Sequence, residues 1–132
     1  PFVPAHATRP AGRFDCIVCF DVVEHSTDPG RTFADMMEFL EDHGLIVFTT
    51  LLQPPEIDQV GLNWWYAGPR NGHVSLFSKE SLVALLERFG FGIASFNDDL
   101  HVLYREVPDF ARHFLIPLDQ YSADPYTTTV LA

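Results

Sequence analysis

Apolar residues are distributed along the chain in the two patterns that mark strands and helices. Residues 16–20 and 44–50 are nearly continuous apolar runs, and the first is typical of a strand buried on both faces. Between them, Asp28 can cap a helix that has Pro29 in its first turn, and Gly44 is a helix stop signal. The apolar face of this helix consists of Phe33, Met36, Met37 and Leu40. Strand, helix and strand joined by short links predict a βαβ unit with parallel strands.

A second helix and a hairpin are predicted farther along the chain. Ser78 can cap an amphipathic helix that Gly90 closes, and the apolar face of that helix carries Leu82, Leu85, Leu86 and Phe89. Residues 92–96 and 100–105 flank an Asn-Asp-Asp turn, which predicts an antiparallel hairpin. In the tail that follows, the one readable pattern is a short helix near residues 110–115.

The segment 51–77, between the second strand and the second helix, is unusually long for a compact domain. It carries an aromatic run, Trp64, Trp65 and Tyr66, and then the sequence Gly-His-Val-Ser-Leu-Phe that ends at Phe77. Parallel α/β sheets bind ligands beyond the carboxyl ends of their strands, and both this segment and the turn after Phe20 leave such an end. The two segments are therefore expected to converge at one edge of the sheet.

Composition and charge narrow the classes of partner. Hydrophobic residues make up 47% of the chain and charged residues 20%, as in globular proteins, and no apolar run approaches the roughly 20 residues of a membrane span. The formal net charge is −10, and the eight Lys and Arg residues form no stripe. Binding to nucleic acid, which depends on neutralising phosphates, and binding to an anionic membrane are therefore disfavoured. A small molecule or another protein is the expected partner.

The two cysteines and the first residue bear on the setting of the chain. Cys16 and Cys19 lie three residues apart in a predicted strand, so their side chains point to opposite faces. They are expected to be buried structural thiols, which suits a reducing, cytoplasmic setting. Because Pro1 is not a natural start and no signal-peptide pattern follows it, the chain is interpreted as a fragment.

Taken in order, these elements resemble the C-terminal half of a class I S-adenosylmethionine-dependent methyltransferase. The resemblance rests on FDCIVCFDVVEH, the Asp-Pro-capped helix, EDHGLIVFTT and GHVSLFSKESLVALLERFGF. It implies an incomplete Rossmann-like α/β fold, with a mostly parallel sheet and a C-terminal antiparallel hairpin. The fourth to seventh strands of the family would be residues 15–20, 44–50, 92–96 and 100–105. Residues 1–132 would be the C-terminal part of a methyltransferase domain, with a core at 14–105 and a tail at 107–132.

The resemblance also implies a function and the residues that serve it. The activity would be methyl transfer from S-adenosylmethionine to an oxygen or nitrogen of a small-molecule acceptor. The cofactor pocket would be lined by Phe20, Asp21 and Val22. The substrate would be covered by the aromatic run, Trp64, Trp65 and Tyr66.

The family's Gly-rich loop and the acidic residue that ends its second strand do not occur in this sequence. The stretch Gly68–Gly72 does not replace the loop, because no strand precedes it and no helix opens at its end. The fragment alone is therefore expected to be inactive. The alternative function is that of a non-catalytic, methyltransferase-like binding or scaffolding module.

Asp21, Glu24 and His25 are spaced so that one turn can point all three in the same direction. In a subset of the family, small-RNA 3′-terminal and some quinone-pathway O-methyltransferases, a similar turn and a later histidine hold a divalent metal. The resemblance therefore implies Mg²⁺ or Mn²⁺ held by Asp21, Glu24, His25 and His73.

Readings without a metal stay open for the same residues. Glu24 and His25 would then cap the following helix or bond to the backbone, or His25 would act as a general base. His73 would be a structural hydrogen-bonding residue, although both histidines are candidate catalytic residues. The remaining histidines show no partner pattern and are expected at the surface: His6, His43, His101 and His113.

One strand is expected to lack a neighbour. In the family, the first strand pairs alongside the fourth, so residues 16–20 would form a bare sheet edge here. No proline or lysine interrupts this apolar strand, and Asp15 is its only charged neighbour at that end. Such an edge invites pairing with another chain. The chain is therefore expected to self-associate through residues 16–20 or to be accompanied by its missing half.

Overall fold

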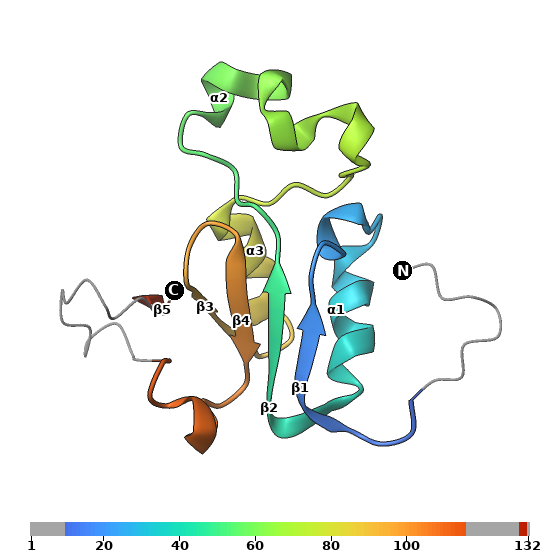
Figure 1. The fold of residues 1–132 in the computed structure, drawn as a ribbon, viewed down its shortest axis with the longest axis vertical. Coiled ribbons are helices and arrows are strands. Elements are labelled where there is room, and N and C mark those ends of the chain that lie inside the picture. The colour runs from blue at the N-terminus through green and yellow to red at the C-terminus, as the bar shows by residue number, and fades with distance from the viewer. Residues whose placement is uncertain (1–9, 116–129, 132) are drawn as a thin grey trace.

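The computed structural model of the chain describes residues 10–115 and the backbone of the two-residue strand β5 (Val130–Leu131), with the side chain of Pro69 left out. Strand β1 (Phe14–Cys19), helix α1 (Pro29–Met37) and strand β2 (Leu40–Thr49) form the predicted βαβ unit, and β1 and β2 are parallel (Figure 1). The predicted cap is confirmed, because the Asp28 side chain accepts a hydrogen bond from the Arg31 amide.

The second half of the chain supplies the predicted helix and hairpin. Helix α3 (Lys79–Glu87) begins after Ser78, whose hydroxyl oxygen accepts a hydrogen bond from the Ser81 amide. Strands β3 (Gly92–Ser95) and β4 (Leu100–Tyr104) pair antiparallel. Their turn is closed by Asn97, whose Oδ1 accepts the amides of residues 99 and 100. No helix in the described part of the chain has both the length and the apolar character that a bilayer crossing requires.

The strands of the sheet lie in the order β1-β2-β4-β3, with β5 paired on the far side of β3. Strand β4 is antiparallel to both of its neighbours, so β3 runs in the same direction as β1 and β2. Among the described strands, β1 and β2 form the one parallel pair. The sheet is therefore mixed, and the expectation of a mostly parallel sheet is not confirmed by its pairings.

Two layers of side chains cover the two faces of the sheet. On one face, α1 and α3 pack against the strands, and Phe33 of α1 meets Phe48 of β2 edge to face with ring centroids 5.2 Å apart. On the other face, Leu45 packs with residues of the tail, Ala111 and Leu115. The short helix expected near residues 110–115 is a single 3₁₀ turn, Asp109–Ala111.

The boundary between α1 and β2 differs from the sequence prediction. Helix α1 ends at Met37, and Leu40, expected on the helix face, is the first residue of β2. The register shifts where residues 41–44 of β2 lie opposite a single residue of β1. A Cβ atom at Gly44 would lie 2.7 Å from Leu40 Cδ1 and 3.0 Å from the Phe14 carbonyl oxygen. Gly44 therefore permits a close approach inside β2 and does not end the helix.

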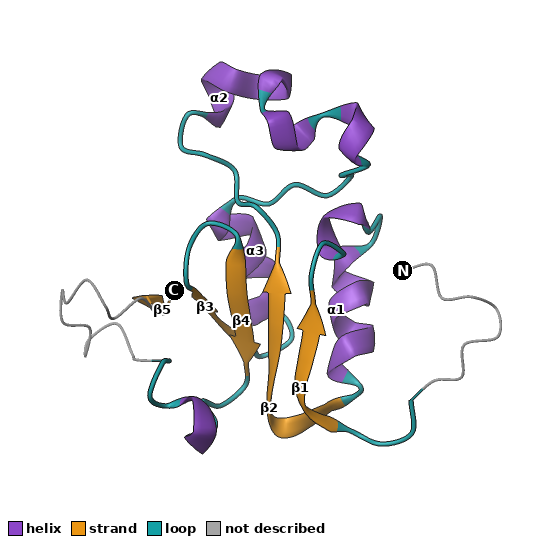
Figure 2. Cartoon of the chain, viewed as in Figure 1, coloured by secondary structure: helices purple, strands orange, loops and turns teal. Residues whose placement is uncertain are grey.

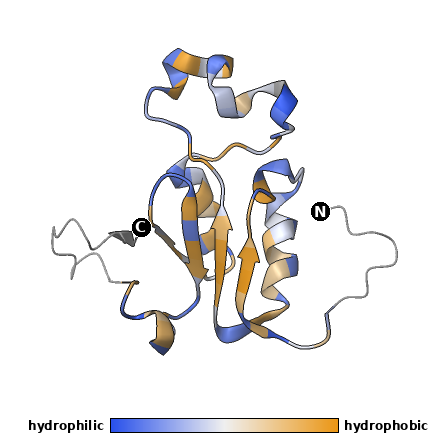
Figure 3. Cartoon of the chain, in the orientation of Figure 1, coloured by the Kyte–Doolittle hydropathy of each residue, from blue (hydrophilic) through white to orange (hydrophobic). Residues whose placement is uncertain are grey.

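Strand β1 is buried on one face only, which corrects the expectation of burial on both. Its side chains Ile17 and Cys19 face α1, whereas Cys16 and Val18 lie in register with Leu45 and Val47 on the other face. Cys16 is exposed, contrary to prediction, and Val18 is 60% exposed. The described tail packs on the neighbouring strands and leaves this face of β1 open. Figure 3 shows the apolar character of β1.

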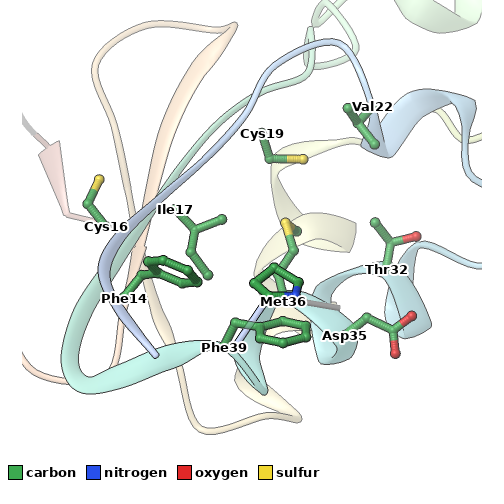
Figure 4. A pocket seen from close by; sticks show the side chains of 10 residues that line it. Phe14, Cys16, Ile17, Cys19, Val22, Thr32, Asp35, Met36 and Phe39 are labelled. Atoms are coloured by element: carbon green, nitrogen blue, oxygen red, sulfur yellow. The ribbon is translucent and has the colours of Figure 1, made fainter. Parts of the chain in front are cut away.

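Among the described strands, β1 pairs with β2 alone, so it forms the sheet edge that the resemblance implied. A pocket of about 410 Å³, the edge pocket, lies between β1 and α1. Figure 4 shows Ile17, Cys19 and Val22 on one side of it and Met36 and Phe39 on the other. Its lining is almost wholly apolar, with Asp35 at one end.

Candidate functional site

Two segments that are far apart in the sequence meet at the carboxyl ends of β1 and β2. After β1 the chain forms a 3₁₀ turn, Val23–His25, and after β2 it forms the long segment that rises above the sheet (Figure 2). This segment contains helix α2 (Ile57–Val60) and three 3₁₀ turns at residues 61–63, 65–67 and 69–71. Its end returns to the first turn, because the amides of Val74 and Ser75 both donate to the Glu24 carbonyl oxygen at 2.8 and 2.9 Å. The expected convergence is thus present.

Glu24 is the most unusual residue in this region. It is only 1% exposed, yet neither carboxylate oxygen makes a hydrogen bond of 3.5 Å or less within the described residues, with the Tyr66 phenol as a polar neighbour. The neighbouring strand end holds a second such group, the hydroxyl of Thr50. Buried polar groups in native proteins are almost always paired, so an orphaned carboxylate requires an explanation. A bound cation would be one.

The same ring nitrogen, Nδ1, is held by a backbone carbonyl in both His25 and His73. His25 Nδ1 lies 3.0 Å from the Gly72 carbonyl oxygen, and His73 Nδ1 lies 2.7 Å from the Tyr66 carbonyl oxygen. A carbonyl can only accept, so each Nδ1 carries the proton, and each neutral ring keeps its lone pair on Nε2. This backbone anchoring of one nitrogen is how metal-binding histidines are commonly oriented. The two rings meet edge to face with centroids 4.8 Å apart.

Three of the four predicted metal ligands are gathered by the fold. One ligand atom each from Glu24, His25 and His73 lies within 4.8 Å of the others. Asp21 is not in this group. Its amide donates to Thr49 Oγ1 at 2.9 Å, and the same hydroxyl lies 3.5 Å from the Asp21 carboxylate. The backbone of Asp21 is left-handed, with φ of 52°, where β1 turns away from the sheet.

The proposed cofactor residues lie at the end of β1. Phe20 and Asp21 are exposed, and Val22 is half-buried and lines the edge pocket. They offer an apolar wall and one carboxylate to a ligand beside the strand end.

The charge of Glu24 affects two neighbouring acids. Burial, together with the nearby Glu24 carboxylate, raises the pKa of Cys19 to about 11. Burial, with a smaller contribution from Glu24, also raises the pKa of the Tyr66 phenol. Both groups therefore stay protonated at neutral pH, and Cys19 is not a candidate nucleophile.

The aromatic run is divided between the core and the surface. Trp64 and Tyr66 are buried, whereas Trp65 is 68% exposed. The Tyr66 ring packs on His73 with centroids 4.0 Å apart, and its hydroxyl accepts a hydrogen bond from the Leu51 amide at 3.2 Å. Of the three residues predicted to form a substrate wall, Trp65 is the one that presents its ring to solvent.

One buried histidine was missed by the sequence prediction. His101, expected at the surface, is 0% exposed in β4, between Thr50 and Ser95. The available signal was its position in the most apolar part of the predicted hairpin. In the structure β4 lies between β2 and β3, which accounts for the burial of His101. His43 and His113 are exposed as expected, and His6 lies outside the described residues.

Comparison with known families agrees with this arrangement. The family model of a methyltransferase domain matches residues 1–95, which include β1, α1, β2, the long segment and α3. No curated protein matches the chain. The match covers well over half of the sequence and includes all the residues of the Glu24, His25 and His73 group. The chain therefore belongs to a class I S-adenosylmethionine-dependent methyltransferase family.

Proposed function

We propose that the chain is part of an enzyme that transfers a methyl group from S-adenosylmethionine to an oxygen or nitrogen of a small-molecule acceptor. Methyl transfer is the activity of its family. The observation that carries the proposal is the convergence of Glu24, His25 and His73 at the carboxyl ends of two parallel strands. That edge is where sheets of this class bind their ligands.

The cofactor would be held on one side by Phe20, Asp21 and Val22. The exposed ring of Phe20 and the half-buried Val22 suit a flat apolar group, and the exposed Asp21 carboxylate suits a hydroxyl donor. These residues fit one side of S-adenosylmethionine, which supplies an electrophilic methyl group when bound. The chain's own residues then have to orient the acceptor and remove its proton.

We also propose a divalent cation at Glu24, His25 and His73. The cation would pair the orphaned carboxylate and accept the Nε2 lone pairs of both rings. Two imidazoles and one carboxylate suit Mn²⁺ or Fe²⁺ better than Mg²⁺, which prefers oxygen ligands. A bound cation lowers the pKa of a coordinated hydroxyl, so these three residues would help an acceptor to lose its proton.

General-base catalysis by His25 is the alternative at the same site. Its ring is exposed, and its Nδ1 is anchored on Gly72, so Nε2 is free to accept a proton from an acceptor. A chelator distinguishes general-base catalysis by His25 from catalysis that depends on a bound cation. Activity that survives chelation supports His25 as the base, whereas activity that is lost and then restored by Mn²⁺ supports the cation.

The cofactor proposal is tested by calorimetric titration of S-adenosylmethionine into the 132-residue chain and into a longer protein that contains it. Binding to the longer protein together with methyl transfer supports the enzyme. Absence of binding to both would instead support the non-catalytic module. Asp21→Ala in the binding-competent protein should weaken cofactor binding with the fold retained, because Asp21 lies at the exposed end of β1.

Finally, we propose that the free edge of β1 pairs with a second copy of the chain. Phe14, Cys16, Val18 and Phe20 are all exposed along this edge. An antiparallel pairing of two copies centred on Ile17 would set the exposed Cys16 of one copy opposite the exposed Val18 of the other. This self-complementary register supports a second copy as the occupant of the edge.

A further inference from the structure

We propose that His101, in the core of the sheet, is a positioning residue for His73. It acts through the peptide unit that joins Thr50 to Leu51, and then through Tyr66. The inference is independent of the cation and cofactor proposed above, except that its metal-binding readout rests on that proposed function.

The first step is the state of the His101 ring. Nε2 lies 2.9 Å from the Thr50 carbonyl oxygen, and Nδ1 lies 2.8 Å from the Ser95 hydroxyl oxygen. Because the carbonyl can only accept, Nε2 carries the proton, and Nδ1 of the neutral ring accepts from Ser95. Both ring nitrogens are therefore used, and the fully buried ring is held in one tautomer.

The second step is a single peptide plane. The carbonyl of Thr50 and the amide N–H of Leu51 belong to the same planar unit, so they point in opposite directions. His101 donates to the carbonyl end, and the N–H end donates to the Tyr66 hydroxyl at 3.2 Å. His101 and Tyr66 thus hold the two ends of one rigid group, and a rotation of that group would break both hydrogen bonds.

The third step leads from Tyr66 to the site. The Tyr66 carbonyl accepts the His73 Nδ1 proton at 2.7 Å, and the two rings pack at 4.0 Å. His73 in turn lies against His25. These contacts keep the His73 proton on Nδ1 and leave the Nε2 lone pair available. The Leu51 amide holds the Tyr66 hydroxyl, so the Tyr66 ring that packs on His73 is positioned by the same peptide unit that His101 holds in the core.

A purely structural role for His101 predicts something different. A buried side chain that only fills space would affect the stability of the sheet and leave the proton of His73 where it is. A positioning role predicts that removing the His101 donor changes the tautomer of His73, even though β4 and the long segment are far apart in the sequence. The tautomer of His73 therefore separates the two roles.

The experiment compares His101→Leu, which removes the donor, with His101→Gln, whose amide can still donate to Thr50. Long-range ¹H–¹⁵N spectra of the metal-free 132-residue chain report which nitrogen of His73 carries the proton. We expect the Nδ1–H form in the wild type and in His101→Gln, and a substantial Nε2–H fraction in His101→Leu. Tyr104→Phe, which removes a half-buried phenol elsewhere on β4, is the matched control and should change nothing.

Tyr66→Phe provides a second route if His101→Leu fails to fold. It deletes the hydroxyl that holds the Leu51 amide while the His101 contacts are kept, so the same change in His73 is expected. In Mn²⁺ titrations, both variants should bind about tenfold more weakly than the wild type. If the wild type binds no Mn²⁺, the proposed cation fails, while the tautomer spectra still decide this inference. An unchanged His73 tautomer in every folded variant would overturn it.

Discussion

His25 and His73 meet edge to face at the carboxyl end of the sheet, and each donates its Nδ1 proton to a main-chain carbonyl. The two residues come from turns that are far apart in the sequence, so their common orientation is a product of the fold. It leaves the Nε2 atom of each ring unused by the backbone, and one nitrogen of each ring lies within 4.8 Å of a carboxylate oxygen of the buried Glu24. The first predictions follow from this arrangement.

Mn²⁺ binding should depend on Glu24 and not on Asp21. Glu24→Gln removes the negative charge at the centre of the group and should weaken Mn²⁺ binding by at least about tenfold in calorimetric titration. Asp21→Asn is the matched control, because the Asp21 carboxylate faces Thr49 and not the two histidines. Equal loss of affinity in both variants would return Asp21 to the set of ligands and contradict the three-residue site.

The metal-free chain should gain stability when Glu24 is replaced by a residue of similar size without charge. A buried acceptor without partners costs about 1–3 kcal/mol, so Glu24→Met should raise the free energy of unfolding by on the order of 1 kcal/mol. Added Mn²⁺ should stabilise the wild type alone, because only its site binds the ion. Chemical denaturation with and without Mn²⁺ measures both effects. A metal-free Glu24→Met that is less stable than the wild type would show that Glu24 contributes to the fold.

His101 should make the stability of the fold depend on pH. Burial lowers the pKa of His101 below its ordinary value of 6.5, so the unfolded chain binds a proton at a pH where the folded ring is still neutral. The stability due to the neutral ring is therefore complete above pH 6.5 and is lost as the pH falls from 6.5 toward the folded pKa. His101→Gln should lose this part of the slope.

Thermal denaturation between about pH 8 and pH 5 measures that slope. The melting temperature of the wild type should fall more steeply with acidification than that of His101→Gln. The exposed His113 provides the control, since His113→Gln should keep the slope of the wild type. Parallel curves for the wild type and His101→Gln would contradict the buried neutral ring.

Self-association through β1 should respond to a charge on the edge. Val18→Lys places a cation on the open face of the strand, and sedimentation should then show a lower average mass than for the wild type. Leu62→Lys is the control, because Leu62 is exposed in the long segment and should not affect association. The net charge of −10 makes two copies repel each other, so association should strengthen with added salt. A wild type that is monomeric at all salt concentrations would rule out the edge contact.

Local signals were sufficient to predict most of the elements. The Asp28 and Ser78 caps, the hairpin turn at Asn97 and the strand runs all depend on residues close in sequence, and each occurs in the fold. The predicted end of helix α1 was wrong. Leu40 fits the helical period of apolar residues, but the pairing of β1 with β2 places it in the strand. Tertiary pairing overrode a local pattern there.

The candidate site was predictable in its residue types and not in its exact membership. Glu24, His25 and His73 could be named from the sequence, because strand ends and histidines are visible in it. Asp21 contacts Thr49 because its backbone is left-handed, and the sequence does not predict a left-handed backbone at a residue other than glycine. Likewise, the burial of His101 and the exposure of Cys16 depend on which strands are central and which are at the edge.

Gly44 limits how this sequence can vary through evolution. Any other amino acid there would bring its first side-chain carbon to 2.7 Å from the tip of Leu40 and 3.0 Å from a backbone oxygen that cannot easily move. A change at position 44 is therefore tolerable only after Leu40 has become smaller, so substitutions at the two positions should occur in that order. The exposed residues 41–43 between them face no such steric limit, although each of them forms an ion pair at the surface.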